Sequence, residues 1–508
     1  MRGRPKDYTM PNDWDIIVIG SGAGGGTFAY ACAKAGKRVL VLERGRRYRL
    51  PEAVHDEQAM LIEKRPYETR TVWLNRSPRR LYAGGVLGGG TSLYGAALVR
   101  PSEDDFHPGR YYGKRIPREI WDWPIPYEAL EPYYYEAERL YEVSGPNDDD
   151  FGLLQKPRQG YPRPPLPLKP INRRIVAANR ARGLKPFRLP LAVDFERCLQ
   201  CPACPGYICL NGSRRSATHL LDSATRHGFQ IEVRTGVEVE RFDWGTGGSV
   251  AGIRVRNLES GQHEVLCAKT YALAAGAIGS PLVLLGSGFS KPLVGRNYMM
   301  HLSPIAFGIF AHETQGDATF VKQLGFADYY EGTRSYRQKL GLIQSLPVPG
   351  KHLIAKTVSK FLPEGLVMRL RTHLALLAGI IEDLPNPANR VSIGPGGGIE
   401  LRHKFSAYDM ERGQKLGAQM RRILRNAGAF LSGVKRLPPE EHVGHQCGTL
   451  RFGKEPKTAI VDSDCRVFES PNLFVVDGSV FPTSLGVGPA LTIMANALRV
   501  ARIAVQVA

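Results

Sequence analysis

Three glycines near the N-terminus have the spacing that holds a pyrophosphate. Residues 20–25 read Gly-Ser-Gly-Ala-Gly-Gly and match the pattern GxGxxG at Gly20, Gly22 and Gly25. Glycines at these positions let the backbone turn tightly and approach a pyrophosphate, which then lies at the positive N-terminus of a helix. Glu43 follows and offers two acceptor oxygens to a ribose diol. These residues predict a dinucleotide site.

A second group of residues that could do chemistry lies near the C-terminus. Residues 444–449 read Gly-His-Gln-Cys-Gly-Thr, and the segments Asp-Gly-Ser-Val-Phe-Pro-Thr at 477–483 and Pro-Ala-Leu-Thr-Ile at 489–493 follow. The imidazole of His445 titrates near working pH, which suits proton transfer. His442 lies nearby and is the alternative, since a solitary histidine is often structural.

Four of the eight cysteines form a third group, with the spacing CxxCxxCxxxxC. Ferredoxin-type ligation uses CxxCxxCxxxC, so the last spacing here is one residue longer. Three interpretations stay open: reduced thiols or disulfides, an iron–sulfur cluster that passes electrons to a partner, and a zinc site. The cysteines are Cys198, Cys201, Cys204 and Cys209.

The segments around the N-terminal glycines have the composition of the elements that such a site needs. Residues 15–19 predict a short apolar strand, residues 27–35 a helix, and residues 38–42 a second strand that ends on Glu43. A lone GxGxxG is weak evidence, but strand, glycines, helix, strand and acid in this order are a strong signal. The order of elements therefore favours a dinucleotide site over a glycine-rich turn that binds no ligand.

The N-terminal fingerprint and the C-terminal motifs together resemble the glucose-methanol-choline (GMC) oxidoreductase family. Matching segments extend from Trp14 to the C-terminus. The resemblance implies an α/β fold with a Rossmann-type FAD-binding domain and a substrate domain built on an antiparallel sheet covered by helices, a PHBH-like arrangement. Because the family's segments interleave, we expect discontinuous domains: residues 12–105, 190–300 and 438–508 for FAD, and residues 106–189 and 301–437 for the substrate.

The resemblance also assigns cofactor contacts beyond the first fingerprint. Residues 88–95 are similar to the family's glycine- and serine-rich loop, and small residues are needed where backbone runs against a flat flavin. Some members attach their flavin to a histidine in this region, and none occurs here, so we expect FAD to be bound noncovalently. The implied contacts are Gly89, Thr91, Ser92, Val237, Ala275, Asp477, Gly478 and Pro489.

In the family, the histidine of His-x-x-Gly-Thr is the base, and here it maps onto His445. The resemblance implies that His445 takes the proton of an alcohol CH–OH group while hydride passes to flavin N5, which gives a ketone or aldehyde. Many members place a second His or Asn at the position of Gly488, which has no side chain to donate or accept a hydrogen bond. Either His301 or Asn496 supplies that contact, His445 acts largely alone, or the protein is a specialised or feeble catalyst.

The cysteine loop resembles that of bacterial members that act on sugars, glycosides or long-chain alcohols. We therefore expect a sugar or glycoside ring hydroxyl as substrate, with reoxidation by oxygen or an electron carrier. One alternative is a lipophilic or secondary-metabolite alcohol. Another is a flavoprotein electron-transfer subunit of a larger dehydrogenase complex, with a small or cytochrome subunit as partner. A third is a flavin-binding protein without catalysis, supported only by Gly488. The oligomeric state stays open.

The chain has 508 residues and a formal charge of +20 from 68 basic and 48 acidic residues. Such an excess favours anionic surfaces, but the basic residues are scattered and no nucleic-acid motif accompanies them, so we expect no nucleic-acid partner. Residues 1–14 lack the apolar core of a secretory signal, and a cytoplasmic protein is expected. The uncharged residues 270–290 contain several glycines and predict a buried strand, a turn and a short helix rather than a membrane span.

Overall fold

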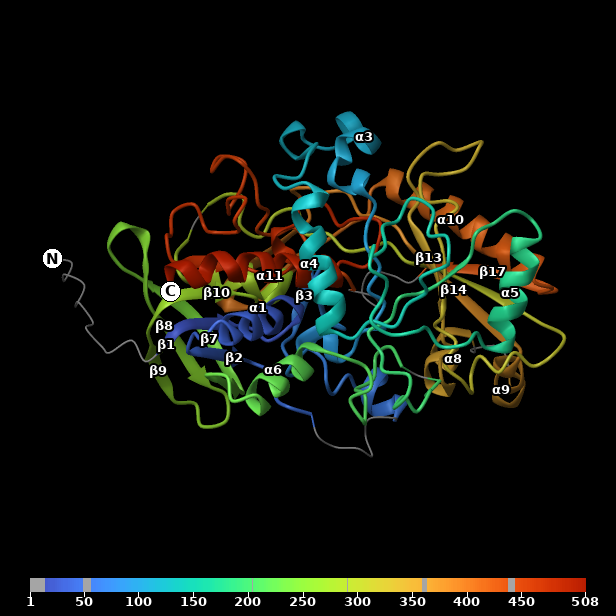
Figure 1. Ribbon diagram of the computed structural model, residues 1–508, viewed down its shortest axis with the longest axis horizontal. Coiled ribbons are helices and arrows are strands. Elements are labelled where there is room, and N and C mark those ends of the chain that lie inside the picture. Colours follow the sequence, from blue (N-terminus) through green and yellow to red (C-terminus); the bar gives the residue numbers. More distant parts are fainter. Residues whose placement is uncertain (1–13, 49–55, 203, 290, 359–362, 437–443) are drawn as a thin grey trace.

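A parallel sheet covered by helices forms one half of the computed structural model, and an antiparallel sheet forms the other (Figure 1). The structure describes residues 14–48, 56–202, 204–289, 291–358, 363–436 and 444–508. His442, the alternative to His445, lies outside the described residues. The predicted combination of a Rossmann-type sheet with a helix-covered antiparallel sheet is confirmed.

The parallel sheet has five strands in the order β18-β10-β1-β2-β6. Its strands are buried and almost wholly apolar near the centre, as expected of a parallel sheet with both faces covered. They come from segments far apart in the chain, so the sheet is complete only when the C-terminal segment returns. The strands are β1 (Trp14–Ile19), β2 (Val39–Glu43), β6 (Ile231–Thr235), β10 (Ala268–Leu273) and β18 (Leu473–Val475).

The helix after the glycine fingerprint, α1 (Ala23–Lys34), begins before the predicted residue 27. Glycine is a poor helix former, so composition places the start too late. Packing explains the earlier start: a Cβ on Gly24 would lie 1.7 Å from the carbonyl oxygen of Val476. The first turn of α1 therefore approaches the sheet at a distance that only glycine allows.

Helix α11 (Ala490–Val507) is the one described helix long and apolar enough to cross a membrane by length and composition, and 61% of it is buried inside the protein. It packs against α1 and α4 (Tyr127–Leu140), as Figure 1 shows. Residues 270–290 form the end of β10 and α7 (Gly276–Gly286), so the predicted strand, turn and short helix are confirmed. Helix α6 (Ala217–Arg226) lies beside α1.

The antiparallel sheet has six strands in the order β17-β11-β14-β13-β12-β5. Helices α10 (Ala407–Asn426) and α5 (Pro170–Arg180) cover it, and their apolar residues form a second core with the strands. The strands are β5 (Phe187–Arg188), β11 (Pro304–Ile309), β12 (Leu324–Phe326), β13 (Leu342–Leu346), β14 (Leu374–Ile380) and β17 (Leu431–Arg436).

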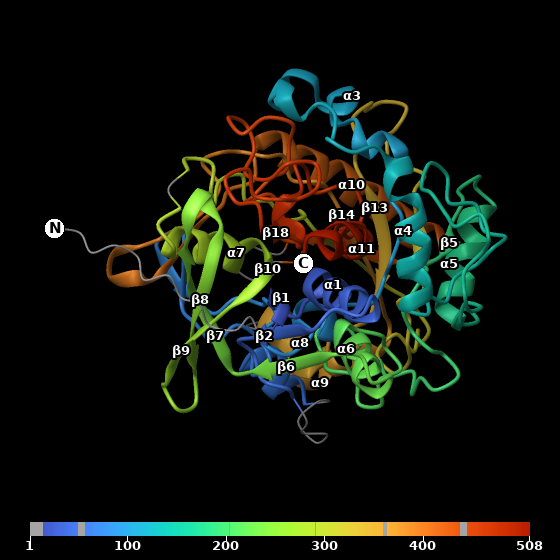
Figure 2. The same cartoon turned by 60° about the vertical axis from the view of Figure 1, so that its left-hand side comes forward.

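Two smaller sheets complete the described part of the fold. One has the order β15-β16-β3-β4, from Arg390–Ile393, Ile399–Arg402, Val72–Leu74 and Ser77–Arg79, and joins residues on both sides of a predicted domain boundary. The other is β7-β8-β9, beside the parallel sheet (Figure 2), from Val237–Trp244, Val250–Asn257 and His263–Leu266. The domain bounds themselves stay a prediction. The remaining α-helices are α3 (Pro108–Tyr112), α8 (Lys351–Val358) and α9 (Glu364–Thr372).

Candidate active site

Two glycine loops meet at the N-terminus of α1. Gly20 has a φ of 99°, and a Cβ on it would lie 2.4 Å from the carbonyl oxygen of Ala274. A Cβ on Gly25 would lie 2.0 Å from the Gly20 carbonyl oxygen. Gly22 caps the helix, and a Cβ there would meet nothing within 4 Å, whereas one on Gly89 would lie 3.1 Å from the Gly22 Cα. Gly20 and Gly25 thus close the turn, and Gly22 borders open space.

Glu43 is tied to both loops through Ser21, the variable second position of the fingerprint. The backbone N–H and the hydroxyl of Ser21 donate to Glu43 Oε2 at 3.0 and 2.5 Å, and the Gly45 N–H donates to Oε1 at 2.6 Å. The Gly88 N–H donates to the Ser21 hydroxyl at 2.8 Å. Burial raises the pKa of Glu43. The motif pattern leaves Ser21 unspecified, so sequence reasoning missed it.

The hydroxyls of Thr91 and Ser92 hold their own loop together. Thr91 Oγ1 donates to the Gly88 carbonyl at 2.6 Å and accepts from the Ala217 N–H at 3.0 Å, at the start of α6. Ser92 Oγ donates to the Leu87 carbonyl at 2.6 Å. These contacts hold the loop that begins at Gly88 in shape and fix it against the start of α6.

The predicted contacts Val237, Ala275 and Asp477 lie along the carboxyl edge of the parallel sheet. Val237 begins β7, directly after β6, and is 6% exposed. Ala275 caps α7 and donates its N–H to Ser280 Oγ at 3.0 Å, and that hydroxyl donates to Asp477 Oδ2 at 2.5 Å. The Gly276 N–H donates to the same oxygen at 2.8 Å. Burial raises the pKa of Asp477.

The segment that carries His445 is fastened to Gly478. The Gly448 N–H donates to the Gly478 carbonyl at 3.1 Å, and a Cβ on Gly478 would lie 2.8 Å from the Gln446 carbonyl oxygen. His445 is half-buried and has a φ of 63°, a left-handed conformation rare for a residue with a Cβ. The carbonyl of Val476 lies against the first turn of α1, and Gly478 bonds the segment of His445. Asp477 lies between these two residues, so this short segment joins the glycine loops to His445.

The His445 ring borders the space in front of Gly488 and makes a close contact with His301. A Cβ on Gly488 would lie 3.5 Å from His445 Nε2, and Pro489 next to it caps α11. His445 Nδ1 lies 2.9 Å from His301 Nδ1, and His301 Nε2 lies 2.8 Å from the Leu485 carbonyl oxygen. Asn496, the other candidate for a second contact, donates to Cys465 Sγ at 3.3 Å instead.

A buried group of charged side chains supports Leu485. Its N–H donates to Glu382 Oε1 at 2.9 Å, while Glu382 Oε2 accepts from Lys339 Nζ at 2.8 Å and from the Tyr112 hydroxyl at 2.6 Å. Lys339 also pairs with Asp105. Burial alone would lower the pKa of Lys339, but the two carboxylates outweigh it and raise that pKa. Sequence reasoning found no role for these residues, because they come from distant segments.

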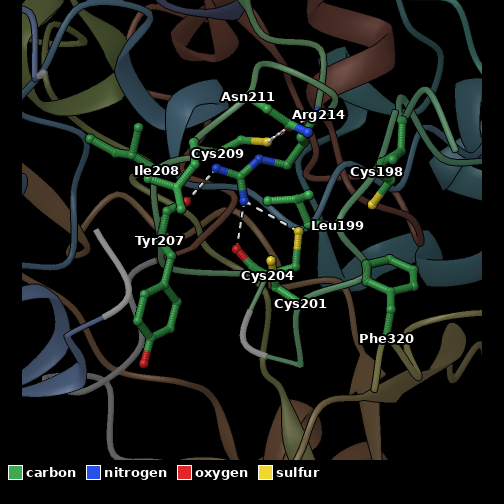
Figure 3. A pocket seen from close by; sticks show the side chains of 12 residues that line it. Cys198, Leu199, Cys201, Cys204, Tyr207, Ile208, Cys209, Asn211, Arg214 and Phe320 are labelled. Carbon is green, nitrogen blue, oxygen red and sulfur yellow. Dashed lines mark hydrogen bonds between the residues drawn. The ribbon is translucent and has the colours of Figure 1, made fainter. Parts of the chain in front are cut away.

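The four clustered cysteines line one hollow with Arg214 among them (Figure 3). The Arg214 guanidinium donates to the Cys204 and Ser92 carbonyls, both at 2.5 Å, which joins this loop to the loop after Gly88. Burial raises the pKa of Cys198 to about 11 and also raises that of Cys201, which disfavours thiolates.

All eight cysteines are free thiols in the structure. Within the described ranges, no group of three or more His, Cys, Asp or Glu side chains has the arrangement of a metal site. The structure therefore gives no support to the interpretation of the cysteine loop as an iron–sulfur or zinc site, nor to a disulfide there.

Comparison with known proteins identifies the family. The N-terminal profile of the GMC oxidoreductases matches residues 14–303 and their C-terminal profile matches residues 397–497. The chain therefore belongs to the GMC oxidoreductase family, and it is a flavoprotein oxidoreductase for CH–OH groups of alcohol or sugar type.

Two curated relatives and one solved structure cover nearly the whole chain. The 6'''-hydroxyparomomycin C oxidase of Streptomyces lividus is 28% identical over 97% of this chain and 92% of its own. The paromamine 6'-oxidase of Streptomyces fradiae is 27% identical over 96% of this chain and 91% of its own. The crystal structure of pyridoxine 4-oxidase from Mesorbium loti is 20% identical, with a TM-score of 0.68 over 97% of this chain and 99% of its own.

The residues at the carboxyl edge of the parallel sheet fit FAD. Gly22, Gly90 and Gly276 all border space in which a Cβ would meet no atom within 4 Å, so cofactor can approach the backbone there. The start of α1 directs backbone N–H groups toward a pyrophosphate. Glu43 accepts three hydrogen bonds from the chain, and a carboxylate has about four acceptor positions, which leaves one for a ribose hydroxyl.

Proposed function

We propose that this protein binds FAD noncovalently and oxidises a hydroxyl of a sugar or glycoside. The observation that carries the proposal is the position of His445. Its Nε2 borders the space in front of Gly488, and Gly448 of the same segment bonds the Gly478 carbonyl, close to the glycines of α1. The names of the two Streptomyces relatives, both oxidases of amino-sugar compounds, support the choice of substrate class.

The chain's own residues then divide the work in a defined way. Gly20, Gly22 and Gly25 shape the turn that receives the pyrophosphate, and Glu43 accepts from the ribose. His445 accepts the proton of the substrate hydroxyl at Nε2. FAD, when bound, supplies the hydride acceptor at N5. Gly488 leaves room beside Nε2 for a hydroxyl on a bulky ring, because it carries no side chain.

An anaerobic titration of the purified holoprotein tests the proposal. The flavin absorbance is followed while single compounds are added: aminoglycosides including paromamine, simple pyranoses and glycosides, and long-chain alcohols. Bleaching by the sugar-type compounds alone is the expected result. Bleaching by long-chain alcohols alone would replace the proposed substrate class by the lipophilic alternative. Air is then readmitted. In an oxidase, oxygen reoxidises the flavin and its absorbance returns, whereas a dehydrogenase needs another acceptor.

A further inference from the structure

The contact between His301 and His445 follows from a short antiparallel bridge. Met299 and Cys447 pair through two backbone hydrogen bonds of 3.0 Å. In an antiparallel pair, residues two positions away on the two strands again lie opposite each other and on the same face. His301 and His445 stand in that relation, and their ring centroids lie 4.9 Å apart. The backbone, rather than a chance rotamer, therefore brings the two imidazoles together.

The partners of His301 determine where the hydrogens lie. The Leu485 carbonyl can only accept, so His301 Nε2 at 2.8 Å carries a hydrogen. In a neutral imidazole the other nitrogen is then an acceptor, so the hydrogen between the two Nδ1 atoms, 2.9 Å apart, belongs to His445. Neutral His445 is thus protonated at Nδ1, and its Nε2 carries the lone pair.

This tautomer is the one that a base facing Gly488 needs. Nε2 is the ring atom that lies 3.5 Å from the position of a Gly488 Cβ. When Nε2 gains a proton, Nδ1 keeps its own, so the hydrogen bond to His301 has the same donor before and after proton transfer. His301 is 1% exposed, and both of its nitrogens have partners within the protein, so it acts through His445 rather than on a substrate.

The carbonyl that orients His301 is itself held in place. Leu485 has a φ of 65°, and its N–H donates to the buried carboxylate of Glu382, which pairs with Lys339. On the other side, the Met300 N–H donates to Asp383 Oδ2 at 3.2 Å. A carbonyl fixed in this way sets the direction of the His301 ring and keeps the hydrogen of that ring on Nε2.

We propose that His301 is a positioning residue that fixes His445 as the tautomer with Nε2 unprotonated. This inference deepens the proposed function, since it rests on His445 being the base. The second imidazole of the site lies behind the base, whereas the resemblance to the family places its second polar side chain at the position of Gly488.

The full-length holoprotein with ¹⁵N-labelled histidine tests this directly, because ¹⁵N shifts distinguish protonated from unprotonated ring nitrogens. The His445 signals are assigned by their loss in His445→Ala. In the wild type, the neutral ring should carry its hydrogen at Nδ1. His301→Asn keeps an acceptor toward Nδ1 and should preserve this state. His301→Leu removes the acceptor and should move hydrogen to Nε2.

Flavin reduction provides the second readout. His301→Leu should slow it about 10²-fold, the lower end of what a positioned base contributes, without loss of FAD, and His301→Asn should restore most of the rate. The matched control is His373→Leu, which removes an imidazole that bonds the Phe310 carbonyl outside the site and should change neither readout.

Protonation of wild-type His445 at Nε2, or an unchanged tautomer in His301→Leu, would overturn the proposal. The wild-type spectrum alone decides if the leucine variant does not fold. A third outcome separates the two proposals. If the tautomers are as expected but no alcohol or sugar reduces the flavin, the proposed function is wrong and the assignment of His301 stands.

Discussion

At the scale of single residues, His445 combines a left-handed backbone with a side chain whose Nδ1 is held by His301. A φ of 63° costs a residue with a Cβ on the order of 1 kcal/mol, and such strain is found at functional sites. His445→Ala should keep bound FAD and lose flavin reduction by about 10² to 10⁴, because the positioned base is gone. Anaerobic stopped-flow absorbance measures this rate, and His373→Ala is the control. A rate within tenfold of the wild type would remove His445 from the proposed chemistry.

The second prediction adds a side chain instead of removing one, at Gly488. A Cβ would lie 3.5 Å from Nε2 and 3.6 Å from Cε1 of His445, which is ordinary contact, and the backbone is not left-handed. Gly488→Ala should therefore fold and bind FAD like the wild type. The methyl group narrows the space beside the base, so kcat/KM for the best substrate should fall roughly tenfold, or about 1.4 kcal/mol. Loss of FAD in this variant would show that the glycine serves packing instead.

At the scale of elements, substitutions at two glycines of the first loop should have different effects: one on cofactor binding and the other on folding. A Cβ on Gly24 would lie 1.7 Å from the Val476 carbonyl oxygen, whereas one on Gly22 would meet no protein atom within 4 Å. Gly24→Ala should force α1 away from the sheet and destabilise the protein by about 3 kcal/mol or more. Gly22→Ala should cost the apoprotein no more than about 1 kcal/mol, because alanine is a poorer helix cap than glycine, but should weaken FAD binding.

Urea unfolding of the apoproteins and fluorescence titration with FAD measure the two effects separately. The two variants add the same methyl group, and helix propensity alone would favour alanine at Gly24, inside α1, over alanine at the cap Gly22. A larger loss of stability in Gly24→Ala therefore reports packing and not propensity. Equal unfolding midpoints for the two variants would contradict the packing that we describe for Gly24.

Some features of this site could be predicted from local sequence and others could not. The strand, glycines and acid around Glu43 form one continuous segment, so spacing alone identifies them. Ser21 occupies a variable position of that pattern, and only the fold shows that it links Glu43 with Gly88. The role of His301 depends on a bridge between residues more than a hundred positions apart. A contact between such distant residues leaves no periodic pattern in the sequence, so it could not be predicted. The contact between Lys339 and Glu382 could not be predicted for the same reason.

At the scale of the whole molecule, the buried charges join distant segments. Asp105, Lys339 and Glu382 are each no more than 2% exposed and come from three separate regions of the chain. Lys339→Met leaves two carboxylates buried without their cation and should destabilise the protein by about 3 to 5 kcal/mol. Urea unfolding measures this loss. The control is Lys185→Met: Lys185 is exposed and pairs with Asp150 at the surface, so its loss should leave the unfolding midpoint nearly unchanged.

Lys322 lies where the two halves of the molecule meet, and it makes stability depend on pH. Its stem contacts the loop after Gly88: a Cβ on Gly95 would lie 2.6 Å from Lys322 Cε. Nζ donates to Gln344 Oε1 at 2.9 Å, and no carboxylate of the described residues lies within ion-pair distance of it. Burial lowers the pKa of Lys322 from 10.5 to about 8.

The sign of the effect follows from proton binding. Between pH 8 and 10.5 the unfolded chain holds a proton on Lys322 that the folded protein has released, so this residue makes stability rise with pH across that window. Below pH 8 both states are charged, and the folded state bears a constant cost of about 3 kcal/mol. Lys322→Met should therefore be more stable than the wild type by about that amount at pH 7, and the gap should close toward pH 10.5. Urea unfolding of both proteins across this range cancels the titration of all other groups, and a gap that stays constant with pH would mean that the methionine acts only through packing.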